Sequence, residues 1–390
     1  MFPISAPPAP IQMLDLAAQH AAIQPELDAA LQHTLQEAAF IQGPAVQAFA
    51  QELSAYLGGP HVIPCANGTD ALQLALMSLN LPAGTEIIMP AFTYVATLEA
   101  AAILGLRPVP VEVRPDTFNL DPAAVEAAIT PRTGAIIVVH LFGQCADLAA
   151  LTTIAAKHSL PIIEDNAQAI GATYQLAGGQ TVAAGTAGYA GTTSFFPSKN
   201  LGALGDGGAL FTTDANRAQL LRQLANHGQT RKYHHEHIGL NSRLDTLQAA
   251  LLRVKLRHLP AWTATRQRLA AQYDAALAGL PGLHIPARDP RSTHVFHQYT
   301  LVVEEGPAGG PNRRDQLQEF LQARGIPSVV YYPLPNHLQP AYGYLGYRAG
   351  QFPVAERLCR TVLSLPIHPT LTDEQVAYVA QAIKAFAERK

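Results

Sequence analysis

Residues 62–79, VIPCANGTDALQLALMSL, join a short apolar run, a turn containing glycine and a helical segment in direct succession. The same alternation continues as far as Phe211. Continuous apolar strands separated by helices are typical of a largely parallel sheet that helices cover on both faces. We therefore expect an α/β protein with a mostly parallel sheet. The expected strands are Ile87–Met89, Val109–Val113, Ala135–Val139, Pro161–Ile163, Thr193–Phe196 and Gly208–Phe211, and the expected helices are Ala71–Leu79, Leu98–Leu104, Pro122–Ala128 and Leu148–His158.

The chain on either side of this region indicates two domains. An N-terminal stretch rich in Pro and Ala, which we expect to form an arm, precedes helical patterns at Ile23–Ala38 and Pro44–Leu57. After the sheet, a long helix over Leu244–Leu277, interrupted at Pro260, is the expected connector. The tail is an α+β pattern with strands Val295–Val303 and Ser328–Tyr332 and helices Arg314–Ala323 and Asp373–Glu388. We place a large domain at 1–255 and a small domain at 256–390.

Composition limits the class of protein. Of the 390 residues 48% are hydrophobic and 14% charged, and the net charge is −3, which excludes a disordered chain and a basic nucleic-acid surface. The three cysteines are too few and too far apart for a disulfide framework. No signal peptide or membrane-length apolar run is evident. We expect a cytoplasmic protein that binds neither nucleic acid nor membrane.

Three motifs at expected strand ends carry the chemistry. In the first, residues 65–70 (CANGTD), Gly68 lets the backbone approach a ligand, and a helix starting at Thr69 or Asp70 would offer free N–H groups to a phosphate. An ordinary helix cap is the commoner reading of that motif alone. In the second, residues 162–168 (IIEDNAQ), an apolar strand runs into Glu164 and Asp165, suited to a cationic ring nitrogen or a metal, although a helix cap or surface charge is an equal alternative.

The third motif, residues 193–208 (TSFFPSKNLGALGDGG), places Lys199 in an aromatic and glycine-rich turn. Burial there would depress the lysine pKa and free its amine for a Schiff base. A phosphate cradle, a carboxylate and a buried amine together are the set that pyridoxal phosphate requires. The combination is more specific than any of its parts.

The chain resembles fold-type I pyridoxal-phosphate enzymes of the DegT/DnrJ/EryC1/StrS family, the nucleotide-sugar aminotransferases. The matching stretches are CANGTDALQLAL, PAFTYVATLEA, HLFGQCADL, IIEDNAQAIGATY, TSFFPSKNLGALGDGG, GLNSRLDTLQAA and YYPLPNHLQPAY. Their wording is most similar to the branch that aminates C3 of UDP-2-acetamido-3-oxo-glucuronate. Related sugar dehydrases carry His where Lys199 stands, so the lysine favours transamination.

The resemblance implies a role for individual residues. Lys199 would form the Schiff base and move the proton, and Asp165 would keep the pyridine nitrogen protonated. Gln168 would lie near the ring hydroxyl and Tyr94 against the ring face. The expected phosphate ligands are Gly68, Thr69, Ser194 and, from a second subunit, Asn241. A homodimer would then share its active sites. Arg243, Tyr331, Tyr332 and His337 are the candidates for substrate contact.

The predicted activity is ping-pong transfer of an amino group, from a donor such as L-glutamate, to a keto group of a nucleotide-linked sugar. Two alternatives stay open: the same chemistry on small amines, aldehydes or ketones, and a regulatory protein that binds the cofactor without catalysis. We predict no metal site. The run His234–His237 is interpreted as a solvated loop, His140 as a satisfied histidine and Glu164 as structural.

Overall fold

The computed structural model describes residues 9–307 and 309–388, so the first eight residues of the expected arm lie outside it. Its centre is a seven-stranded sheet in the order β1-β9-β8-β5-β4-β2-β3. The strands are β1 (His61–Cys65), β2 (Glu86–Pro90), β3 (Arg107–Val111), β4 (Thr133–Val139), β5 (Ile162–Asp165), β8 (Ala190–Ser194) and β9 (Gly208–Thr212). All neighbours from β8 to β3 pair in parallel, and only β9 runs against its neighbours β1 and β8. The expected mostly parallel sheet is confirmed.

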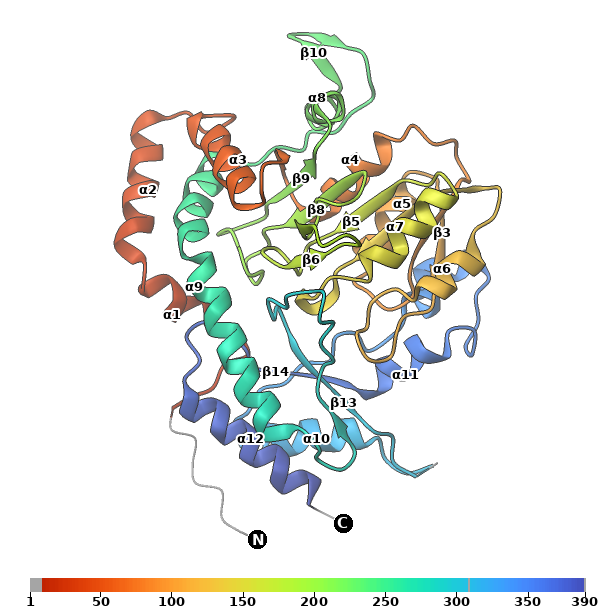
Figure 1. The fold of residues 1–390 in the computed structure, drawn as a ribbon. Helices are drawn as coiled ribbons and strands as arrows, with labels where there is room; N and C mark the ends of the chain where they lie inside the picture. Colours follow the sequence, from red (N-terminus) through yellow and green to blue (C-terminus); the bar gives the residue numbers. More distant parts are fainter. Residues whose placement is uncertain (1–8, 308, 389–390) are drawn as a thin grey trace.

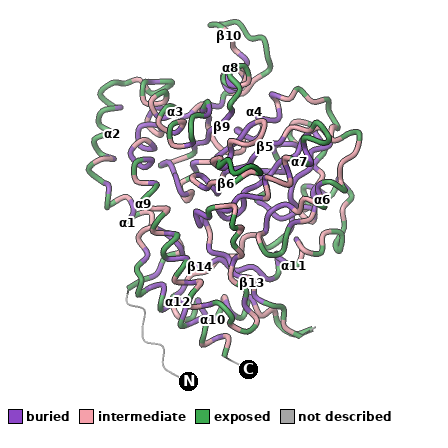
Figure 2. Tube along the Cα trace, viewed as in Figure 1, coloured by how far each residue is buried: buried purple, intermediate pink, exposed green. Residues whose placement is uncertain are grey.

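Helices cover both faces of the sheet (Figure 1). The apolar side chains of β2 show why: Ile87 and Met89 pack beneath α4 (Gly68–Met77) and α5 (Ala96–Ile103), whereas Ile88 packs beneath α6 (Pro122–Ala128) and α7 (Leu148–Lys157). Alternate residues of a strand point to opposite faces, so an unbroken apolar strand serves two cores. Figure 2 shows the resulting buried centre.

Helix α9 (Thr246–Leu277) joins the two domains and contains Pro260 without a break, so the expected interruption is wrong. A proline inside a helix costs about 3 kcal/mol. Packing on both sides of it offsets that cost here, because Leu259 lies in the core of the large domain and Leu269 in that of the small domain. The N-terminal helices α1 (Leu16–Ala21), α2 (Gln24–Glu37) and α3 (Pro44–Tyr56) precede the sheet, and α2 and α3 pack against α9 (Figure 1).

The small domain has a three-stranded antiparallel sheet of β12 (Leu283–His284), β13 (Tyr299–Val303) and β14 (Val362–Leu365). Its helices are α10 (Arg313–Gln322), α11 (Pro353–Thr361) and α12 (Asp373–Ala387). The expected strand at Ser328–Tyr332 is wrong: only Val329 bridges to β14, and the chain then turns toward the large domain. Ile11 packs into the small-domain core, so the N-terminal segment crosses from one domain to the other.

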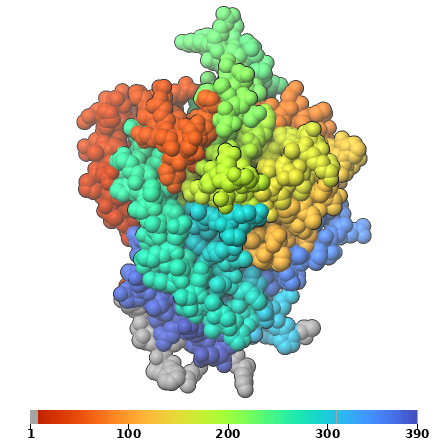
Figure 3. Space-filling model, in the orientation of Figure 1, coloured from red at the N-terminus to blue at the C-terminus, as the bar shows by residue number. Residues whose placement is uncertain are grey.

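Two short hairpins complete the fold, β6–β7 (Thr173–Gln175 and Thr181–Ala183) and β10–β11 (Gln229–Arg231 and His234–His235). The second projects from the body of the molecule (Figures 1 and 3) and is exposed from Arg231 to Ile238. The run His234–His237 therefore lies in solvent, as expected, although in a hairpin. Among the described residues no helix is long and apolar enough to cross a membrane.

Candidate active site

The functional side chains meet at one edge of the sheet. Strand β5 ends at Asp165, β8 leads to Lys199, β1 leads to the turn before α4, and β2 leads to Tyr94. Because β5, β8, β1 and β2 all run in one direction, their carboxyl ends lie together, which is where open α/β sheets bind ligands.

Lys199 and Asp165 form the centre of the site. The Lys199 turn is closed by hydrogen bonds from the Lys199 N–H to the Phe196 carbonyl (2.8 Å) and from the Ala203 N–H to the Phe195 carbonyl (2.7 Å). Burial lowers the pKa of Lys199 to about 8, and the charge of Asp165 opposes that shift. Burial also raises the pKa of Asp165. The hydrogen bond from the Ala167 N–H, the charge of Lys199 and the hydrogen bond from Thr97 each lower it, but burial has the larger effect. The site thus holds an amine that loses its proton near pH 8 beside a desolvated carboxyl group.

Asp165 is fixed by two donors. Its Oδ2 accepts from Thr97 Oγ1 at 3.1 Å, and its Oδ1 from the Ala167 N–H at 3.2 Å. Sequence reasoning missed Thr97, although it lies in the quoted stretch PAFTYVATLEA, in the first turn of α5.

The neighbouring acid, Glu164, has a different role. Its two oxygens accept from the backbone N–H groups of Gly185 (2.9 Å), Ala187 (2.7 Å) and Gly188 (2.6 Å), and Oε2 lies 2.9 Å from His140 Nε2. The Ala146 N–H donates to His140 Nδ1, so the histidine proton is on Nε2 and points at Glu164. Both side chains are fully buried, which confirms Glu164 as structural and His140 as satisfied.

The phosphate site that the sequence predicts would lie at the start of α4. The helix begins at Gly68, one or two residues earlier than expected, and the Asn67 side chain caps it by accepting from the Asp70 N–H at 2.8 Å. A Cβ atom at Gly68 would lie 2.7 Å from Ser194 Cβ, so only glycine lets this helix start approach the end of β8 so closely. Gly68, Thr69 and Ser194 are therefore gathered as expected, with the positive end of α4 toward them.

Gln168 connects Asp165's loop to two other segments. Its Oε1 accepts from the Phe142 N–H at 2.7 Å, and its Nε2 donates to Tyr332 Oη at 3.0 Å. The Tyr332 ring lies 6.1 Å from that of Tyr94, centroid to centroid. Burial raises the pKa of Tyr332, and the Asp165 charge adds to the rise, so this phenol stays protonated. Tyr94, Gln168 and Tyr332 thus line one side of the site together.

The other candidates for substrate contact, and the phosphate candidate Asn241, lie in different surroundings. Tyr331 packs beside Tyr332, with ring centroids 6.0 Å apart. The His337 side chain is fully buried and pairs with Glu356 at 3.1 Å, so in this structure it supports the wall of the site and is not on its surface. Arg243 donates to Asn226 at 3.2 Å, and Asn241 is exposed. Neither contacts Lys199 or Asp165 of the same chain in the part of the structure described.

A desolvated amine, a buried carboxyl group and a helix start that approaches its neighbouring strand closely are the groups that pyridoxal phosphate requires. A family model described as the DegT/DnrJ/EryC1/StrS aminotransferase family matches residues 21–384, and the chain belongs to that family. It is therefore a pyridoxal-phosphate-dependent aminotransferase with the expected α/β fold.

Named relatives cover almost the whole chain. A UDP-2-acetamido-2-deoxy-3-oxo-D-glucuronate aminotransferase of Pseudomonas aeruginosa is 44% identical over 96% of this chain and 99% of its own. A protein of Geobacillus stearothermophilus named pleiotropic regulatory protein is 45% identical over 96% of this chain and 98% of its own. The crystal structure of Streptomyces venezuelae DesV in complex with a ketimine intermediate has a TM-score of 0.92, 43% identity, and covers 98% of this chain and 99% of that one.

Proposed function

We propose that the protein transfers an amino group from an amino acid, in the first instance L-glutamate, to a keto group of a nucleotide-linked sugar. The observation that carries the proposal is the amine of Lys199, whose pKa is lowered to about 8, beside the carboxyl group of Asp165. Bound pyridoxal phosphate would supply the electron sink that stabilises a carbanion at the carbon carrying the amine.

The residues of this chain fit that cofactor. Lys199 would hold it through its amine and afterwards carry the proton, because a group with a pKa near the working pH can both accept and donate. Asp165, held by Thr97 and the Ala167 N–H, would face the ring nitrogen and keep it protonated. Gly68, Thr69 and Ser194 would bind the phosphate, Gln168 the ring hydroxyl and Tyr94 the ring face. Tyr331, Tyr332 and Arg243 would contact the substrate, with His337 behind them.

We infer that the enzyme is a homodimer in which each subunit completes its partner's site. Asn241 is exposed, and the adjacent hairpin exposes Tyr233 to 81% and Ile238 to 91%. A cavity of about 820 Å³ beside it is lined by Arg243, Asn226, and parts of α3 and β1. A second copy covering this face would bury the exposed side chains and bring Asn241 to the other subunit's phosphate.

The acceptor is supported by the names of relatives: the Pseudomonas protein and relatives from Streptomyces and Aneurinibacillus are transaminases of UDP- or dTDP-linked sugars. The regulatory alternative is supported only by the names of two relatives, the Geobacillus protein and a protein of Saccharopolyspora erythraea named erythromycin biosynthesis sensory transduction protein. Lys199 and Asp165 are both in place in this chain, which favours catalysis. We place the enzyme in the cytoplasm because its three cysteines are buried and free.

The absorbance of the protein loaded with pyridoxal phosphate, before and after L-glutamate, tests the reaction. We expect a yellow band that bleaches on addition of glutamate and returns with a nucleotide keto-sugar. A band that returns only with small ketones or aldehydes would favour the small-substrate alternative. A band that no amino acid bleaches would favour the regulatory one.

Mixing two inactive variants tests the shared site. Lys199→Ala and Asn241→Ala dimers each lack a necessary group at every site. After subunits exchange, mixed dimers would contain one site with both groups intact, so activity should return. Mixed dimers that stay inactive would show that Asn241 serves its own subunit.

A further inference from the structure

Asn200, the residue after the catalytic lysine, ties the lysine turn to a distant segment. Its side chain is buried; Nδ2 donates to the Val295 carbonyl at 3.1 Å, and Oδ1 lies 3.2 Å from His297 Nδ1. Val295 and His297 belong to the stretch that leads into β13, which we call the strap and define as residues 289–298. The lysine turn is thus held by a segment almost a hundred residues later in the chain.

The hydrogen bonds determine which ring nitrogen of His297 carries a proton. Since Asn200 Nδ2 donates to a carbonyl, the Oδ1 atom faces the histidine, and an amide oxygen only accepts. His297 Nδ1 must therefore donate. Burial lowers the pKa of His297 well below its usual value, and the charges of Lys199 and Arg266 lower it further, so the ring is uncharged.

The strap also contacts the opposite side of the site. The Val295 N–H donates to the Gly143 carbonyl at 2.9 Å, and the Gln298 N–H to the Phe142 carbonyl at 3.2 Å. Phe142 in turn donates its N–H to Gln168. The backbone of Phe142 has φ of 58° and that of Phe296 has φ of 49°, a region that bulky residues rarely occupy unless their surroundings impose it.

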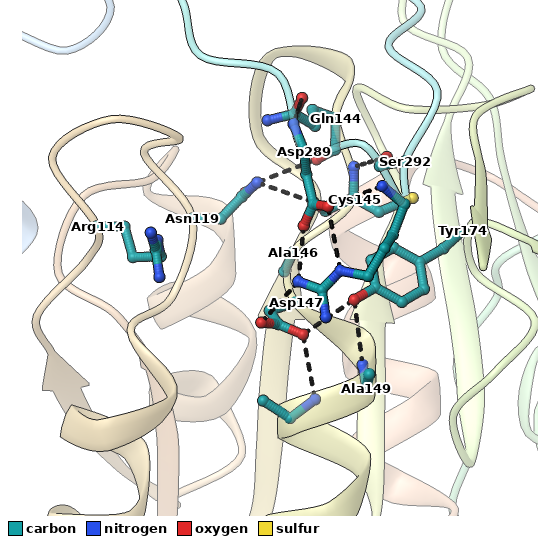
Figure 4. A network of polar contacts seen from close by, with 12 residues as sticks. Arg114, Asn119, Gln144, Cys145, Ala146, Asp147, Ala149, Tyr174, Asp289 and Ser292 are labelled. Carbon is teal, nitrogen blue, oxygen red and sulfur yellow. Dashed lines mark hydrogen bonds and ion pairs between the residues drawn. The ribbon is translucent and has the colours of Figure 1, made fainter. Parts of the chain in front are cut away.

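A polar network fixes the beginning of the strap to the large domain (Figure 4). Arg291 bridges Asp147 and Asp289, at 2.9 Å to each, and Tyr174 Oη donates to Asp147 at 2.9 Å. The Cys145 N–H donates to Ser292 Oγ at 3.1 Å. Because Asp147 caps α7, the strap is held to a rigid element before it reaches the site.

We propose that the strap is a positioning device that holds the Lys199 turn and the Gln168 side of the cofactor site at a fixed separation. His297 is the positioning residue for Lys199, acting through Asn200. The inference rests on the proposed role of Lys199. Its basis is that two segments on opposite sides of the site share this one support.

A pair of substitutions separates the hydrogen bond from the bulk of the ring. His297→Leu removes the donor, whereas His297→Asn puts an amide N–H where Nδ1 stood. His368→Leu is the matched control: this histidine is also buried and also near Arg266, but it contacts Thr370 and the Gln12 carbonyl, away from the site. Asn200→Ala breaks the same contact from the lysine side and replaces His297→Leu if that variant does not fold.

Two measurements are made on each full-length variant. The first is the pH dependence of acylation of Lys199 by an amine reagent, in protein stripped of cofactor and followed by mass spectrometry of its peptide. The second is the rate of bleaching by L-glutamate in the loaded enzyme. We expect His297→Leu to move the labelling midpoint from about 8 toward the value of an exposed lysine, about 10.4. Its bleaching rate should fall roughly 10- to 100-fold, the cost of a reacting group misplaced by about 1 Å.

His297→Asn should restore both values to near those of the wild type, and His368→Leu should change neither. The proposal is overturned if His297→Leu labels like the wild type, if His297→Asn fails as badly as His297→Leu, or if His368→Leu shifts the curve equally. A wild-type midpoint near 10.4 instead of 8 would refute the role of Lys199 itself, and with it the proposed function.

Discussion

The turn after β8 and the N-terminal half of α9 each contain a lysine whose pKa is lowered, and the two differ in what their amines contact. Burial lowers the pKa of both Lys199 and Lys255 to about 8. Lys255 is 2% exposed, and its Nζ donates to the Gly202 carbonyl at 2.6 Å. Lys199 keeps some accessible surface, lies beside Asp165, and has no hydrogen-bonding partner for its amine among the described residues. A lowered pKa alone therefore does not distinguish the two lysines, whereas the hydrogen bond that the Lys255 amine makes does.

The largest expected effect on the rate is the difference between removing the Lys199 amine and removing the Lys255 amine. Lys199→Ala should slow bleaching by L-glutamate by a factor on the order of 10⁴ or more, since the nucleophile and proton carrier are the same group. Lys255→Met should cost less than about tenfold, because that amine only supports the turn. Both rates are measured by stopped-flow absorbance. Losses of similar size would contradict the comparison.

The adjacent residues Asp165 and Glu164 offer a second comparison, between two carboxyl groups. Asp165→Asn should lower the glutamate half-reaction on the order of 10³-fold, because a neutral amide does not keep the ring nitrogen protonated. Stability should hardly change, since burial already raises the pKa of Asp165 and makes its charge costly in the empty protein. The midpoint of thermal unfolding without cofactor is the check on stability. A variant that unfolds many degrees lower would assign Asp165 a structural role.

Glu164→Gln should give the opposite result. The carboxylate accepts hydrogen bonds from three backbone N–H groups and from His140. In the glutamine variant an NH₂ group replaces one of the oxygens, and it cannot accept hydrogen bonds from these donors. We expect a loss of about 3 kcal/mol in the free energy of unfolding, measured by urea denaturation. The variant that does fold should retain most of its bleaching rate. A strong loss of rate without loss of stability would move Glu164 into the catalytic set.

The sequence was sufficient for the parts of the site that depend on local pattern. Apolar runs predicted the parallel sheet, and Asp165 ends a strand while Gly68 and Lys199 lie a few residues beyond one. The contacts that hold them could not be predicted, because Thr97 reaches Asp165 across 68 residues and Asn200 reaches His297 across 97. A hydroxyl or a histidine has no periodicity that identifies its partner.

The errors have the same origin. The segment Ser328–Tyr332 has the β-branched and aromatic residues of a strand. Tyr332 instead accepts a hydrogen bond from Gln168, and only Val329 bridges to the sheet. Pro260 predicts a helix break from local sterics, but burial on two cores overrides it. Tertiary packing decided both cases, and nothing within a few residues of either position indicates it.

The smallest expected effect is the change in the free energy of unfolding when Lys255 is replaced, and its sign changes with pH. An unfolded lysine has a pKa of about 10.4, whereas that of Lys255 is about 8. Below pH 8 both states are charged, and the folded state carries the full cost of burying the cation, at most about 3 kcal/mol. Between about 8 and 10.4 the unfolded state binds more protons, so the stability of the wild type rises with pH and the cost disappears.

Lys255→Met removes that cost but leaves the Gly202 carbonyl without its donor, which costs about 1–3 kcal/mol. We therefore expect the variant to be more stable than the wild type by about 1 kcal/mol at pH 7 and less stable above about pH 10. Urea denaturation at the two pH values measures this crossing. Lys255→Arg, which stays charged throughout, should show no crossing. A variant that is less stable by the same amount at both pH values would mean that folding does not lower the pKa of Lys255 and that the lysine is retained for its hydrogen bond.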